Sequence, residues 1–145
     1  MNTDNNKWSE KKNVAVLKKF LGSLELETME FMWQLGEATV KQVVGAINRR
    51  RPIAYTSVMT VMGHLVGKGL LSRTKEGKSY LYKVAQDRKK YLQSISRKMV
   101  RTLVEDFGDI AIAHFLGEVD SIDNGKLTQL RKSGQEAGSE RNASK

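Results

Sequence analysis

The sequence of 145 residues contains no cysteine, a single proline and only two histidines. Without cysteine the chain has no disulfide framework, no cysteine zinc cluster, no thiol nucleophile and no thiolate copper site. No apolar run approaches the roughly 20 residues that a membrane-spanning helix needs. The polar start also lacks the basic segment and apolar stretch of a secretory signal. We therefore expect a cytoplasmic protein without membrane insertion.

Acidic residues are nearly absent from the middle of the chain. Residues 41–90 hold twelve Lys or Arg against Glu76 and Asp87, a net charge of +10, whereas residues 1–40 sum to −1 and residues 91–145 to zero. A basic block confined to one region is typical of a protein that binds a polyanion. The alternative, a merely solvated surface, fits poorly because acidic residues are so scarce there.

Residues 54–66 are the most informative segment, because as a helix they divide into two chemically different faces. An apolar stripe at three- and four-residue spacing would face the core, and it consists of Val58, Val61, Met62 and Leu65. The opposite face lacks the Lys and Glu of an ordinary exposed helix. In their place it carries short polar side chains and glycines, namely Thr56, Ser57, Thr60, Gly63, His64 and Gly67.

A helix face of short side chains can approach another surface closely, and the groove of a nucleic acid is one such surface. Thr and Ser can donate and accept hydrogen bonds at base edges and phosphates. We therefore predict that the residues contacting the DNA groove are Thr56, Ser57, Thr60 and His64. The alternative interpretation is a polar helix face that merely lacks charge.

Two helices are predicted before this segment. Ser23 is the expected N-cap of the first, which runs to about Leu35, and Gly36 suits the position after its end. Thr39 and Gln42 form a capping box at the start of the second. The buried stripe of that second helix is Val40, Val43, Val44 and Ile47, and the helix stops at Arg49-Arg50-Arg51-Pro52.

Two strands are predicted after the third helix, at 70–74 and 79–84, around a turn that contains Gly77. Three helices and a hairpin in this order indicate a winged helix-turn-helix, so the predicted fold class is mainly α with a small β-hairpin. Basic residues flank the third helix and occupy the wing, where phosphates of bound DNA would lie. The predicted phosphate contacts are Arg49, Arg50, Arg51, Arg73, Lys75 and Lys78.

The next three segments are also predicted to be helical, at 87–104, 109–117 and 123–131, with Asp87 as the N-cap of the first. Small helices of this kind cannot bury their own apolar faces, and a second copy of the chain is the simplest partner. The residues expected at a homodimer interface are Leu92, Ile95, Met99, Leu103, Ile112, Phe115 and Leu116.

Four parts of the chain follow from these patterns. Residues 1–20 form an N-terminal extension. An apolar patch at its end could be a helical turn packed on the next domain, and it consists of Val14, Ala15, Val16, Leu17, Phe20 and Leu21. Residues 21–85 are the winged helix-turn-helix domain, and residues 86–131 are the helical dimerisation region. Residues 132–145 are low in hydrophobicity, which predicts a disordered tail.

Motifs of other protein classes are weak in this chain. Gly77-Lys78-Ser79 mimics the end of a P-loop, but Ser72 stands where the first glycine belongs and the context is a hairpin. His64 and His114 lie fifty positions apart with no carboxylates at ligand spacing. His114 is expected to be a partly buried packing or interface residue. We expect no catalytic residue, no metal site and no cofactor, and hence no enzyme.

Several motifs that carry a family resemblance stand in order along the chain. They are Leu24-Glu25-Leu26-Glu27 with Met29 and Trp33, Gly36-Glu37-Ala38-Thr39-Val40, Ala54-Tyr55-Thr56-Ser57-Val58-Met59-Thr60-Val61, and Leu65-Val66-Gly67-Lys68-Gly69-Leu70-Leu71. In these motifs the chain resembles the penicillinase repressor family of winged-helix transcription regulators, whose familiar members are BlaI, MecI and CopY. The resemblance is strong over residues 21–85. It is weaker to residue 131, where Ala113-His114-Phe115-Leu116 matches a family segment.

The resemblance implies a homodimeric repressor that binds a palindromic DNA operator through its third helix and wing. It also implies dimerisation through the C-terminal helices. In the better-known members, a membrane sensor protease signalled by a β-lactam leads to cleavage in the C-terminal helical region. The matching bond here would lie between His114 and Phe115. Copper-responsive members carry cysteine pairs near the C-terminus, and their absence from this chain argues against copper sensing.

The leading hypothesis is therefore a transcriptional repressor that binds double-stranded DNA. An alternative of another class is a winged-helix interaction module whose basic face binds an acidic protein or RNA. The charge pattern alone separates these two hypotheses only weakly, because any polyanion is attracted to a basic face. An enzyme would need a nucleophile, a metal cluster or a cofactor loop, and the sequence offers none.

Overall fold

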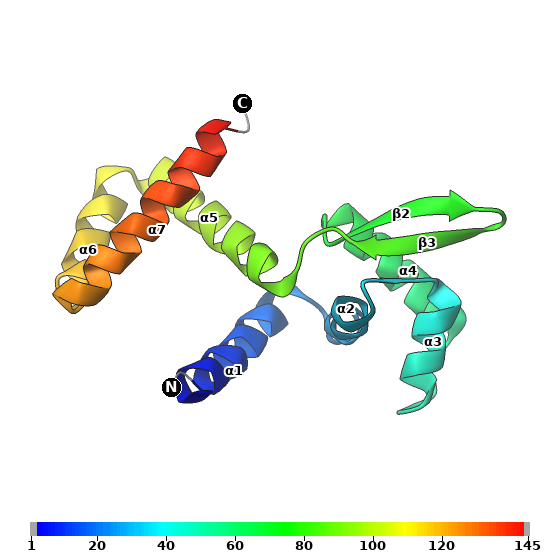
Figure 1. The fold of residues 1–145 in the computed structure, drawn as a ribbon. Helices are drawn as coiled ribbons and strands as arrows, with labels where there is room; N and C mark the ends of the chain where they lie inside the picture. The colour runs from blue at the N-terminus through cyan, green and yellow to red at the C-terminus, as the bar shows by residue number, and fades with distance from the viewer. Residues whose placement is uncertain (1–2, 144–145) are drawn as a thin grey trace. The chain divides into compact units, whose positions relative to one another are not determined.

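The computed structural model describes residues 3–143, with side chains described for residues 12–136. The chain divides into two compact units, and the boundary between them in the sequence lies between Ser96 and Arg97. The first, called the winged unit, contains α1 (Thr3–Phe20), α2 (Ser23–Leu35), β1 (Glu37–Ala38), α3 (Val40–Asn48), α4 (Tyr55–Gly67), β2 (Leu71–Glu76), β3 (Ser79–Val84) and the start of α5 (Arg88–Phe107). The second, called the helical unit, contains the rest of α5, α6 (Asp109–Val119) and α7 (Asn124–Ala143). Figure 1 labels these elements along the chain.

Helix α2 begins one residue earlier than the sequence predicted. Gly22, not Ser23, is the N-cap. The Gly22 N–H donates to Glu25 Oε1 at 2.9 Å, so a carboxylate in the first turn reaches back and satisfies the backbone donor of the N-cap residue. The predicted end at Leu35 is confirmed. Gly36 adopts φ of +79°, and its N–H donates to the carbonyl of Met32 at 2.7 Å.

The predicted capping box at the start of α3 is confirmed. The Gln42 N–H donates to Thr39 Oγ1 at 3.3 Å, and the Thr39 N–H donates to Gln42 Oε1 at 2.8 Å. These two bonds fix where the helix starts, and they turn its apolar stripe of Val40, Val43 and Ile47 into the core. The turn to α4 is held by Asn48, whose side-chain oxygen accepts from the Ile53 N–H at 2.9 Å.

The predicted hairpin is present as β2 and β3, joined by a turn in which Gly77 adopts φ of +63°. Figure 1 shows the hairpin, coloured green, as the wing next to α4. A third strand that the sequence did not indicate, β1, pairs with the other edge of β3, so the antiparallel sheet has the order β1-β3-β2. Because β1 has two residues, its strand character comes from this pairing and not from any local pattern.

The core of the winged unit extends beyond the predicted domain of residues 21–85. Leu17 of α1 is fully buried in it, and Tyr91 of α5 is also buried. The end of α1 and the start of α5 therefore belong to the winged unit, and the predicted boundaries were too narrow at both ends. The remaining core is Leu21, Leu26, Met29, Met32, Ala38, Val40, Val43, Ile47, Val58, Met62, Leu65, Leu70, Leu71 and Tyr82.

The helical unit confirms the predicted helices at the level of secondary structure. Asp87 caps α5 as expected, since its Oδ1 accepts from the Lys90 N–H at 2.7 Å. Helix α6 has no buried residue. Large apolar side chains along α5 and α6 are instead exposed, namely Met99, Val100, Leu103, Val104, Phe107, Ile110, Ile112, Phe115 and Leu116.

The predicted disordered tail is wrong as far as Ala143, because α7 continues to that residue. Low hydrophobicity suggested disorder, but residues 132–143 contain no proline and include Lys, Gln, Glu, Ala and Arg, which favour a helix. Residues 144 and 145 of the predicted tail lie outside the described residues. Among the helices in the described part of the chain, none combines the length and hydropathy needed to cross a membrane.

Candidate DNA interface

The two predicted faces of α4 are present in the structure. Val58, Met62 and Leu65 are fully buried, and Val61 packs against the core as a half-buried side chain. On the opposite side, the four predicted groove residues Thr56, Ser57, Thr60 and His64 are all exposed. The core therefore holds α4 with its short polar side chains directed to solvent.

One hydroxyl on this exposed face is already engaged within the helix. Thr60 Oγ1 donates to the carbonyl of Thr56 at 2.9 Å. This bond restricts the rotation of the Thr60 side chain and leaves its oxygen lone pairs and its methyl group available to a partner. Thr56 and Thr60 are one helical turn apart, so both lie on the same exposed strip of α4.

The arginine run between α3 and α4 divides into side chains with different contacts. Arg51 Nη2 lies 2.7 Å from Glu27 Oε1 of α2 and forms an ion pair with it. The Arg50 guanidinium lies over the ring of Phe31, 4.9 Å from its centroid. Arg49 is exposed at the C-cap of α3. Two of the three arginines of this run are thus held against α2 by their own side-chain interactions.

The wing carries basic and aromatic side chains on one face. The register pairs Arg73 with Tyr82 and Lys75 with Tyr80, so these four side chains share a face of the hairpin. The Arg73 guanidinium lies 4.7 Å from the Tyr80 ring centroid, and the hydrogen bond to the Tyr82 phenol raises the pKa of Arg73. Lys75 and Lys78, at the tip, are exposed.

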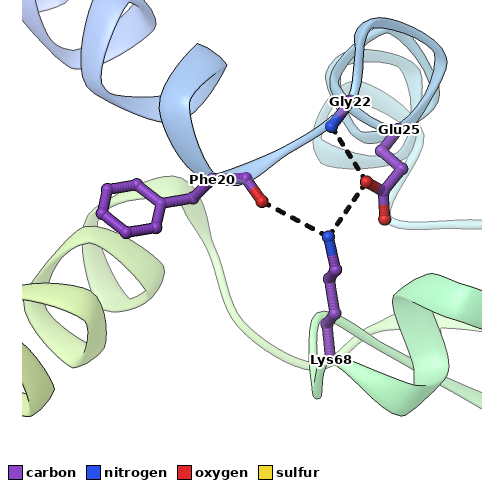
Figure 2. A network of polar contacts seen from close by, with 4 residues as sticks. All are labelled: Phe20, Gly22, Glu25 and Lys68. Atoms are coloured by element: carbon purple, nitrogen blue, oxygen red, sulfur yellow. Dashed lines mark hydrogen bonds and ion pairs between the residues drawn. The ribbon is translucent and has the colours of Figure 1, made fainter.

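One lysine of the basic block is used inside the winged unit. Figure 2 shows Lys68 Nζ bound to Glu25 Oε1 at 2.9 Å and to the carbonyl of Phe20 at 3.3 Å, while the Gly22 N–H donates to the same carboxylate oxygen. This network joins the end of α1, the start of α2 and the end of α4. No sequence pattern indicated it, because the two charged partners lie 43 positions apart.

The protonation of Glu25 reflects this network. Partial burial is the largest influence and raises the pKa, but hydrogen bonds from Gly22 and Lys68, with the charges of Lys68 and His64, outweigh it. The pKa of Glu25 therefore lies below its ordinary value. A carboxylate held in this way stays ionised at neutral pH and keeps the end of α4 tied to α2.

A second link fixes the segment that leads into α5. Trp33 Nε1 of α2 donates to the carbonyl of Gln86 at 3.0 Å, and Gln86 Nε2 donates to the carbonyl of Gly69 at 2.9 Å. The Arg88 guanidinium lies 5.0 Å from the Trp33 ring centroid. The residues between the wing and α5 are therefore bound to α2 and to the end of α4.

The predicted dimer residues fall into two groups. Leu92 and Ile95 are half-buried against the core of the winged unit, so the chain itself covers part of their surface. Met99, Leu103, Ile112, Phe115 and Leu116 are exposed, with Phe115 at 64%. His114, expected to be partly buried, is exposed beside Phe115 on α6. The second group therefore offers the larger apolar surface to another chain.

Within the part of the chain that the structure describes, no three or more histidine or acidic side chains gather where they could hold a metal ion. His64 and His114 belong to different units. The arrangement that the structure does assemble is a two-faced helix next to a basic wing.

Comparison with known proteins gives a consistent result. The family profile described as "Penicillinase repressor" matches residues 21–136. A transcriptional regulator BlaI from Mycobacterium tuberculosis is 35% identical over 104 residues, which cover 68% of this chain and 73% of that protein. A penicillinase repressor from Bacillus licheniformis is 21% identical over 110 residues, covering 76% and 85% of the two chains. The solution structure of the DNA-binding domain of the repressor BlaI has a TM-score of 0.45 at 24% identity, covering 49% of this chain and 87% of that one.

The fold, the site and the family profile define a class. The chain is a DNA-binding transcriptional repressor built on a winged helix-turn-helix. Because the profile spans most of the chain and the mycobacterial relative exceeds a third in identity, the chain belongs to the penicillinase repressor family, as its sequence motifs indicated.

The Glu25 network predicts a pH-dependent contribution to stability. Because the folded pKa is lowered, the contribution is present above the ordinary pKa of 4.5 and is lost as pH falls through the folded value. We expect Glu25→Gln to lower the free energy of unfolding by roughly 1 kcal/mol at about pH 7, with the difference from the unaltered protein closing as the pH falls below the ordinary value of 4.5 and through the lowered pKa of Glu25. Urea titrations across this range measure both.

Glu37→Gln is the matched control. Glu37 lies 4.0 Å from Lys83, and both side chains are more than half exposed, so solvent screens the pair. This variant should unfold like the unaltered protein at every pH. A Glu25→Gln difference that is the same at low and neutral pH would contradict the assigned ionisation.

Proposed function

We propose that this chain represses transcription by binding a palindromic DNA operator as a homodimer. The observation that carries the proposal is the exposed face of α4, which presents hydroxyls and one imidazole and is flanked by the basic wing. An α-helix fits the major groove, where base edges carry a distinct pattern of donors and acceptors for each base pair. Such a protein acts in the cytoplasm, the compartment that holds the DNA.

The proposed contacts divide by chemistry. Thr56, Ser57, Thr60 and His64 meet base edges or the adjacent backbone, because they line the outward face of α4. Phosphate contacts come from Arg49, Lys75 and Lys78, which are exposed, and from Arg50, Arg51 and Arg73, whose guanidinium groups are held on neighbouring side chains. An arginine that is already positioned loses less conformational entropy when it binds a phosphate.

The proposed dimer forms through the exposed apolar side chains of α5 and α6. Apolar residues exposed in such number on two neighbouring helices exceed what a surface usually leaves to solvent. A second copy supplies a matching surface, because a two-fold interface is made from the same patch on both chains. Two recognition helices related in this way meet successive major grooves about 34–36 Å apart, which requires a palindromic site.

Release is proposed to act on the dimer and not on the DNA-binding face. The resemblance to the better-known family members, which respond to a sensor protease, suggests the matching bond His114–Phe115, and this bond lies within α6. A helix must open locally before a protease can cleave it, and within a single chain α6 has no buried residue that opposes opening, so cleavage acts on the surface proposed to hold the dimer together. Separating the two DNA-binding domains of a dimer removes the gain in operator affinity that comes from linked binding, and this gain can reach about 10²-fold or more.

The wing predicts a change in salt dependence. Replacing Lys75 and Lys78 together by Ala should flatten the plot of log affinity against log salt by about 0.9 for each phosphate that the variant no longer neutralises. The operator is obtained by sequencing the fragments of the source genome that the purified protein retains. Fluorescence anisotropy on this DNA measures the slope. Lys83→Ala is the control, since Lys83 is on the opposite face of the hairpin and should leave the slope unchanged. If the double variant at Lys75 and Lys78 shows the same slope as Lys83→Ala, the wing does not touch DNA.

The helical unit predicts the oligomeric state. Placing Asp at both Met99 and Leu103 puts charge on the exposed apolar face of α5, so light scattering should report a monomer and operator affinity should fall at least tenfold. Lys98→Asp reverses a charge on the same helix away from that face, and this variant should remain a dimer. A dimer that survives the double substitution would place the interface elsewhere.

The cleavage proposal predicts a fragment. When cells are exposed to an inducing β-lactam, immunoblotting should detect a chain ending at His114 as operator occupancy falls. An engineered protease site in place of His114-Phe115 should release the operator when it is cut in vitro. If occupancy falls while the chain stays intact and dimeric, release by proteolysis is wrong.

A further inference from the structure

Two large apolar side chains interrupt the polar surface of α4. Tyr55 is 50% exposed and Met59 is 46% exposed. They lie four positions apart and are therefore neighbours on one side of the helix. Because Met59 follows Thr56 by three positions and precedes Thr60 directly, it borders the strip of hydroxyls proposed to meet base edges.

The surface next to Met59 is open. Gly63 lies one turn further along the helix, and a Cβ built on it would meet no atom within 4 Å. Packing within the described chain therefore does not require glycine at this position. Gly in the middle of a helix is less favourable than Ala by about 1 kcal/mol. Met59 and Gly63 together form an apolar contact surface with space beside it.

The major groove contains one apolar group that such a surface can recognise. Among the four bases, only thymine presents a methyl group there, on C5, and the other base edges present hydrogen-bond donors and acceptors. A flexible thioether adapts well to a small apolar group. Tyr55, in the first turn of α4, lies where recognition helices meet base edges.

We propose that Met59, supported by Tyr55, reads the C5-methyl group of a thymine in each operator half-site. The inference rests on the proposed DNA-binding function and adds a determinant of specificity to it. The hydroxyls of α4 distinguish bases by hydrogen bonding, whereas Met59 distinguishes thymine from the other three bases by its methyl group. The space beside Gly63 lets the helix approach closely enough for this contact.

The test uses uracil, which pairs like thymine and lacks only the methyl group. Thymines of the retained operator are replaced by deoxyuridine at one pair of symmetry-related positions at a time. Losing one buried methyl costs about 0.8 kcal/mol, so one such pair of positions should weaken binding of the full-length protein roughly 3- to 5-fold per half-site. Replacement at the other positions should change affinity less than twofold.

Met59→Ala identifies the side chain responsible. The variant should bind the unmodified operator more weakly and should bind thymine and uracil duplexes equally at the sensitive position, as a double-mutant cycle requires. Thr60→Ala is the matched control on the same face, and it should retain the full effect of uracil. Thermal unfolding of Met59→Ala should match the unaltered protein because Met59 is not part of the core.

Each other outcome is informative. If no uracil position weakens binding, if the operator half-sites lack thymine, or if Met59→Ala remains sensitive to uracil, the inference is overturned while the repressor function stands. If the protein retains no DNA fragment from its source genome, or binds RNA as tightly as duplex DNA, the proposed function itself fails.

Discussion

The orientation of α4 depends on the burial of Val58, Met62 and Leu65, and the rest of the interface depends on that orientation. Each fully buried side chain of this size contributes about 1.5–3 kcal/mol relative to an exposed one. Since these residues occupy one stripe, burying them fixes how the helix is rotated about its own axis. The hydroxyls of the opposite face are thereby directed outward without any interaction of their own. The core of the winged unit, shared by α2, α3 and the sheet, therefore sets the geometry of the surface that we propose faces DNA.

Features that depend on short sequence separations could be predicted well. The Thr39 and Gln42 capping box, the glycine that ends α2 and the two faces of α4 all arise within about one helical turn or a few turns. Features that depend on tertiary pairing could not. Strand β1 exists because β3 lies beside it, and Lys68 finds Glu25 only after α4 packs on α2. The N-cap of α2 was misplaced by one residue because Gly22 has no side chain to signal a cap, and its N–H is satisfied by the Glu25 carboxylate that reaches back to it.

Several basic side chains of residues 41–90 make contacts within the chain itself. Lys68 is paired with Glu25, Arg51 with Glu27, and Arg50 and Arg88 lie over aromatic rings. These cations brace α2 against neighbouring elements, and they leave Arg49 and the wing lysines exposed. Lys68 and Arg88 are not among the proposed phosphate contacts, so net charge alone overstates the number of groups at the proposed interface. It still locates the interface, because the braces and the exposed cations surround the same helix.

The hydrogen bond from Thr60 to the carbonyl of Thr56 has a consequence for polarity. A hydroxyl has one proton, and here that proton is directed along the helix. Toward a partner, the Thr60 oxygen therefore offers lone pairs, and it complements amino groups such as adenine N6 or cytosine N4. Guanine O6 and thymine O4 would face a second acceptor at that point. The Thr60 hydroxyl could otherwise donate or accept a hydrogen bond. Because its proton is used within the helix, it can only accept from a partner and therefore favours hydrogen-bond donors.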